Sequence, residues 1–115
     1  MRVFAVLTAL GFVLAAAPAV AKTMDSTFGN TVTVTHPDGA VERYFFEPDG
    51  SFTARMPGGQ NVVGQWVRRD AEVCLTVQGQ DENCTPVADD KNVGDSWTLE
   101  TGGGSLVIAI VRGRS

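Results

Sequence analysis

Two cysteines, one histidine and thirteen acidic side chains are the groups through which this chain could do chemistry. A redox-active or metal-binding role for Cys74 and Cys84 would need a Cys-x-x-Cys spacing or a nearby histidine, and neither is present. The two cysteines instead lie symmetrically about Gly79, where a hairpin would bring them opposite each other on adjacent strands. We therefore predict a structural disulfide, which closes a loop of about eleven residues and stabilises the domain by ~2–3 kcal/mol.

Hydrolysis by a serine nucleophile would depend on His36, the one histidine of the chain. No Gly-x-Ser-x-Gly motif accompanies it, so we expect a solvent-exposed histidine at a turn. A pair of carboxylates for glycosidic chemistry could be chosen only arbitrarily, and we expect Glu42 and Glu72 to face solvent on a sheet. These patterns predict no enzyme, no catalytic residue and no cofactor.

The segment from Asp89 to Asp95 gathers oxygen donors in the manner of calcium-binding loops. It lacks the full Asp-x-Asp-x-Asp-Gly register and the closing glutamate of such a loop, and Lys91 lies inside it. We predict a solvated acidic loop and no metal site, and calcium binding there stays open as the alternative.

The N-terminal residues 1–21 have the features of a signal peptide. Arg2 precedes an apolar run from Val3 to Ala17, and Ala19-Val20-Ala21 is a small-x-small cleavage site. The run is shorter than the roughly 20 apolar residues that span a bilayer as a helix. We therefore expect cleavage after Ala21, a periplasmic or secreted bacterial product without stable membrane insertion, and a flexible mature N-terminus over residues 22–29.

The charge pattern of the mature chain bears on its partners. Without Arg2, eight of the nine basic side chains remain against thirteen acidic ones, which gives a net charge of minus five. The longest basic cluster is Arg68-Arg69, so there is little to neutralise phosphates. We therefore expect no nucleic-acid partner.

Residues 30–115 predict a single all-β domain, because short β-prone runs alternate with turn signals such as Pro37-Asp38-Gly39 and Pro48-Asp49-Gly50. No helical stripe interrupts them. The predicted strands are 31–35, 41–46, 51–55, 61–69, 72–77, 83–87, 96–100 and 105–112. Short connections favour an antiparallel meander of about eight strands, closed as a small barrel in which the last strand meets the first. A two-layer β-sandwich is the alternative.

Aromatic side chains could line a ligand cavity in such a barrel or fill its core. Gly64 stands two residues before Trp66, which we interpret as room for that ring on the same face of the strand. Phe45 and Phe46 must point to opposite faces, so one of the aromatic residues here is exposed or covered by another segment. The aromatic residues predicted for the core or a ligand site are Tyr44, Phe46, Trp66 and Trp97.

The chain resembles short exported bacterial β-rich proteins of unknown function. The resemblance rests on Tyr44-Phe45-Phe46, Asp49-Gly50-Ser51-Phe52, Gly64-Gln65-Trp66, Val73-Cys74-Leu75 and Cys84. The Gly-x-Trp motif in a meander also resembles calycin-type barrels, meaning lipocalins and the small barrel inhibitors of proteases. The resemblance implies a fold and a compartment, and it transfers no functional residue.

Together these features predict a non-catalytic binding module of the bacterial cell envelope, which engages a small apolar ligand or another protein. The alternative is an inhibitor of a hydrolase, of protease or lysozyme type, which presents a rigid loop held by the disulfide. That loop consists of Gln78, Gly79, Gln80, Asp81 and Glu82. A closed apolar cavity near Trp66 would favour the first function, and a filled barrel with a protruding loop would favour the second.

Overall fold

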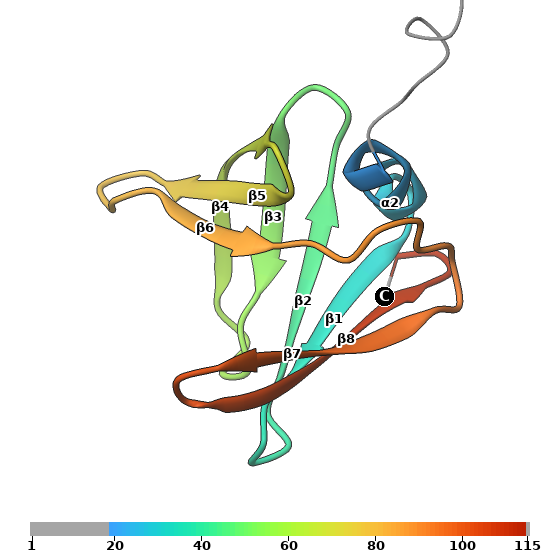
Figure 1. Cartoon of the computed structure of the whole chain (residues 1–115). Coiled ribbons are helices and arrows are strands. Elements are labelled where there is room, and N and C mark those ends of the chain that lie inside the picture. The colour runs from blue at the N-terminus through green and yellow to red at the C-terminus, as the bar shows by residue number, and fades with distance from the viewer. Residues whose placement is uncertain (1–18, 115) are drawn as a thin grey trace, which may run out of the picture.

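Eight antiparallel strands form one sheet that curls into a half-barrel, with a short helix near one end (Figure 1). The computed structural model describes residues 19–114, so most of the predicted signal peptide lies outside the described residues. The elements are α2 (Ala19–Thr27), β1 (Thr31–Thr35), β2 (Val41–Phe46), β3 (Ser51–Arg55), β4 (Asn61–Arg69), β5 (Glu72–Val77), β6 (Asn83–Pro86), β7 (Ser96–Thr101) and β8 (Gly104–Val111).

The strand order is β6-β5-β4-β3-β2-β1-β8-β7, which confirms the predicted all-β meander. The predicted contact between the last strand and the first is also present, since β8 pairs antiparallel with β1. The barrel is not closed, however. Within the described residues β6 and β7 form the two edges of the sheet. The fold is therefore a single curled sheet rather than a two-layer sandwich.

Tight turns fix the register of the first hairpins. In the first turn the amide of Gly39 donates to the carbonyl of His36 over 2.9 Å, and the Asp38 carboxylate accepts from the amide of Ala40. Gly39 has a φ of 92°, a conformation that side chains other than glycine rarely adopt. The second Asp-Gly turn repeats this geometry, so both predicted turns are confirmed.

The concave face of the sheet carries the core. Phe52 and Ala54, predicted to share a face of their strand, are both buried, with 2% and 0% of their surface exposed. Strand β8 is apolar on both faces, as expected. Its Ile108 and Ile110 are buried, whereas Val107 and Val111 are exposed on the convex face. Phe45 lies under the guanidinium of Arg114, 5.3 Å from the ring centre, and so is covered by another segment.

Gly64 makes room for a different ring from the one we predicted. It pairs with Phe52 across β3 and β4, and a Cβ atom at Gly64 would lie 2.7 Å from the Phe52 ring and 2.4 Å from the backbone oxygen of Thr76. The glycine is therefore required by the neighbouring strands and not by Trp66. The signal was misread because the register between strands was not known from the sequence.

Helix α2 corrects our expectation of a flexible segment over residues 22–29. Thr23, Met24 and Thr27 of this helix are buried. A helix of nine residues is marginal in isolation, so its contacts with the sheet must stabilise it. The Thr23 hydroxyl donates to the carbonyl of Ala88 over 2.7 Å and accepts from the amide of Lys91 over 3.0 Å. In the part of the chain that the structure describes, no helix has the length and hydropathy to cross a membrane.

Candidate functional site

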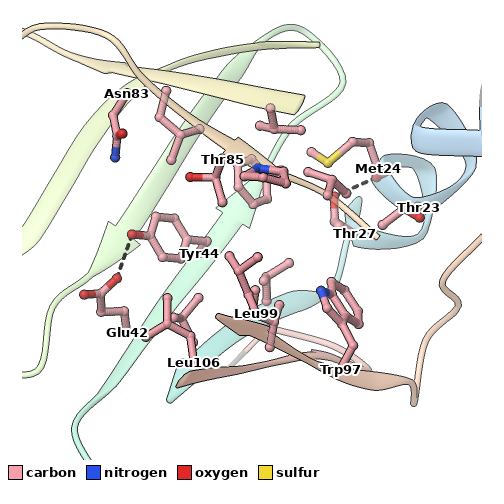
Figure 2. Close-up of a pocket in the computed structure, with 18 of the residues that line it drawn as sticks. Thr23, Met24, Thr27, Glu42, Tyr44, Asn83, Thr85, Trp97, Leu99 and Leu106 are labelled. Carbon is pink, nitrogen blue, oxygen red and sulfur yellow. Dashed lines mark hydrogen bonds between the residues drawn. The ribbon is translucent and has the colours of Figure 1, made fainter. Parts of the chain in front are cut away.

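A cavity of about 240 Å³ lies on the concave side of the half-barrel, between the sheet and α2 (Figure 2). Strands β1, β2, β5, β6, β7 and β8 all contribute to its wall. Alternate residues of each strand face inward, which explains why a strand pair such as β7 and β8 supplies Trp97, Leu99, Leu106 and Ile108. The apolar lining residues are Met24, Val32, Val34, Phe46, Val73, Leu75, Pro86, Val87, Trp97, Leu99, Leu106 and Ile108.

One end of the cavity is polar. The Tyr44 hydroxyl donates to Oε1 of Glu42 over 2.7 Å, and Nε2 of His36 lies 2.8 Å from Oε2 of the same carboxylate. Burial, and then the hydrogen bond to Glu42, raises the pKa of the Tyr44 hydroxyl well above its ordinary value. Tyr44 therefore stays protonated at neutral pH and acts as a donor to the carboxylate.

This polar end corrects one expectation. Glu42, which we expected to face solvent, points inward, and 21% of its side-chain surface is exposed. His36 stands at the turn as expected, with 34% of its side-chain surface exposed, and its Nε2 also contacts Glu42 at the cavity wall.

The sequence held a signal for this cluster. Glu42 and Tyr44 are two residues apart on one strand, so their side chains share a face. The His36 amide donates to the carbonyl of Ala40 across the turn, so His36 lies opposite Ala40 and Glu42 is its diagonal neighbour on that face. The signal was missed because charged strand residues were assigned to solvent.

The opposite end of the cavity is covered by α2. Met24 and Thr27 line the cavity there, and the two hydrogen bonds of Thr23 join the helix to residues 88–91. Near the polar end, a shallow surface cleft shares His36 and Glu42 with the cavity and is otherwise lined by Pro37, Asp38, Ala40, Pro57 and Gly103. The cavity and the solvent-facing cleft therefore meet at Glu42.

The four predicted aromatic residues do not all lie at this cavity. Tyr44, Phe46 and Trp97 line it. Trp66 packs instead against Phe46 and Phe28, and its indole N–H donates to the carbonyl of Glu47 over 2.8 Å. Trp66 thus packs against the core beside Phe46, which is one of the two roles predicted for these rings.

Cys74 and Cys84 form the predicted disulfide and pair directly across β5 and β6. Among residues 19–114, one group of three potential metal ligands lies close together, and it consists of these two cysteines and Glu72. The two sulfurs are bonded to each other in the disulfide, so neither is a free thiolate. The predicted interaction loop, residues 78–82, is exposed and projects from the half-barrel at the tip of this hairpin (Figure 1). The Glu82 carboxylate also pairs with Arg69.

The acidic segment from Asp89 to Asp95 connects β6 to β7. Its amide at Asn92 donates to the Asp95 carboxylate over 2.8 Å, and Lys91 places its ammonium 5.7 Å from the centre of the Trp97 ring. Part of the acidic charge therefore closes a local turn, and the amide of Lys91 supplies one of the two anchor points of α2.

No family model, no curated protein and no solved structure matches this chain. The likeness to calycin-type barrels therefore stays a prediction from the sequence, and the arguments for function come from the cavity and its lining.

Proposed function

We propose that this protein is an exported, non-catalytic binding module of the bacterial cell envelope that holds a small apolar ligand in its interior cavity. The observation that carries the proposal is the cavity itself, whose wall is predominantly apolar and includes a few polar groups, with Glu42, His36 and Tyr44 at one end and Thr23 and Thr27 at the helix. Ligand sites in proteins are commonly of this kind. By comparison, an apolar cavity of about 150 Å³ accepts benzene.

One further feature supports export, because the disulfide is compatible with an oxidising compartment. Cleavage after Ala21 would remove the first three residues of α2 and keep Thr23, Met24 and Thr27, which contact the cavity or anchor the helix. Mass measurement of the protein recovered from a bacterial periplasm tests this part, and a mature N-terminus beyond Thr27 would contradict it.

Titration of the mature protein with n-octanol tests ligand binding. We expect a saturable change in tryptophan fluorescence, because Trp97 lines the cavity, and a matching heat in calorimetry. Val34→Phe places a larger side chain into the cavity and should abolish both signals. Val63→Phe, at a residue with 64% of its surface exposed, is the matched control and should bind as wild type does.

Circular dichroism of each variant checks that it is folded. Absence of saturable binding, or binding unchanged by Val34→Phe, would contradict the proposal.

The projecting hairpin supports a second candidate function, inhibition of a hydrolase. Its exposed tip and its disulfide fit a rigid loop that enters an active-site cleft. Assays against lysozyme and a set of proteases test it. Inhibition should disappear when Gln80 and Asp81 are both replaced by alanine, and it should survive Val34→Phe.

A further inference from the structure

The polar end of the cavity has a definite charge and hydrogen-bonding character. Glu42 is the only acidic residue of the cavity wall, and the described lining residues include no lysine or arginine. The neighbouring Arg43 pairs with Arg55 across β2 and β3, and alternation places it on the opposite face of the sheet from Glu42. A ligand that reaches this end therefore meets a carboxylate whose hydrogen-bonding neighbours are Tyr44 and His36.

The hydrogen bonds already made there leave acceptors open. A carboxylate has about four lone-pair sites, and Tyr44 and His36 occupy one on each oxygen of Glu42. The Tyr44 hydroxyl donates its hydrogen bond to Glu42, so its oxygen is free to accept one from a ligand. A donor group on the ligand would fill these acceptor sites on Glu42 and Tyr44, while Asn83 and Thr85, which also line the cavity, offer both donors and acceptors.

We infer that the cavity selects a small apolar amine, with its ammonium group at Glu42 and Tyr44 and its apolar body along Leu99 and Leu106 toward Trp97. This inference rests on the proposed ligand-binding function. Glu42 lies where the cavity meets the surface cleft and keeps contact with water, so an ammonium group there is not fully desolvated. Charge-assisted hydrogen bonds are stronger than neutral ones, which favours an ammonium over a hydroxyl.

The volume sets the size of the amine. A 150 Å³ cavity holds the six non-hydrogen atoms of benzene, so about 240 Å³ has room for roughly ten. The probes n-octylamine, n-octanol and octanoate have close to this number of atoms and differ in the polar end alone. An alkylamine resembles the lysine side chain in its pKa and is protonated at pH 8.

Calorimetry and tryptophan fluorescence at pH 8 measure the three affinities for the mature protein. We expect n-octylamine to bind roughly tenfold or more tightly than n-octanol, and octanoate to bind more weakly than either. Glu42→Gln should remove the preference for n-octylamine over n-octanol. Glu100→Gln changes the net charge equally on an exposed part of β7 and should keep the preference.

The outcomes separate the two proposals. Equal affinity for n-octylamine and n-octanol in the wild-type protein overturns the inference and leaves the ligand-binding function standing, and this comparison depends on no variant. A preference that persists in folded Glu42→Gln overturns it as well. Absence of binding by all three probes overturns both.

Discussion

Gly64→Ala tests the packing of β3 against β4 and β5 most directly. The added methyl group would lie 2.4 Å from the backbone oxygen of Thr76 and 2.7 and 2.9 Å from two ring carbons of Phe52. The Phe52 ring has 2% of its surface exposed, and the Thr76 oxygen belongs to the strand paired with Gly64. Neither neighbour can move without disturbing the core or the β4–β5 pairing. We expect a loss of about 1–3 kcal/mol, the usual cost of overpacking.

Urea unfolding of the mature protein, followed by circular dichroism, measures this loss. In thermal unfolding each kcal/mol should lower Tm by about 4–8 °C for a domain of this size. Gly58→Ala is the matched control, because Gly58 needs no positive φ and a Cβ atom there meets nothing within 4 Å. A Gly64→Ala protein within about 0.5 kcal/mol of wild type would refute the register on which the reasoning depends.

Two further predictions concern the ends of the cavity. Thr23→Val removes the hydroxyl that bonds Ala88 and Lys91, so it should lower the free energy of unfolding by about 1–3 kcal/mol. Ser26→Ala, whose hydroxyl makes only an exposed bond within α2, should change it little. Equal effects of the two substitutions would contradict the anchoring role of Thr23. Burial raises the pKa of Tyr44 in the folded state. The stability that Tyr44 contributes through this shift is therefore fully present below its unfolded pKa of about 10 and is lost as pH rises above that value. Tyr44 is the one tyrosine, so phenolate absorbance should appear only with unfolding, and ionisation in the folded protein near pH 10 would contradict this.

Most of the sheet could be predicted because its signals are local. The Asp-Gly turns end one strand and begin the next, so the bounds of β1, β2 and β3 follow from the positions of Gly39 and Gly50. The symmetry of the two cysteines about Gly79 gave the β5–β6 pairing in the same way. In each case the information lies within about ten residues of chain.

The candidate site was harder to predict because it depends on contacts between distant segments. Helix α2 buries Thr23, whose partners Ala88 and Lys91 lie more than sixty residues away, and Thr27, whose hydroxyl donates to the carbonyl of Met24. Its sequence therefore shows no apolar stripe. The inward position of Glu42 is compatible with its strand, but alternation alone does not say which face is concave. We assigned charged strand residues to solvent, where such residues usually lie. That assignment was wrong for Glu42, whose carboxylate lies in the cavity wall.

The open edge of the barrel and the cavity have a common origin. Eight strands that close completely leave an interior that side chains fill, or that holds one small ligand. Here β6 is short, its last backbone hydrogen bond beside β5 is donated by the Val87 amide to the carbonyl of Ala71, and the chain then crosses to α2 through the Thr23 contacts. Met24 and Thr27 thus complete the wall beside β6 and β7. Because a helix attached by few hydrogen bonds covers this end, loosening it with Thr23→Val should also weaken n-octanol binding, which links the stability of α2 to the proposed function.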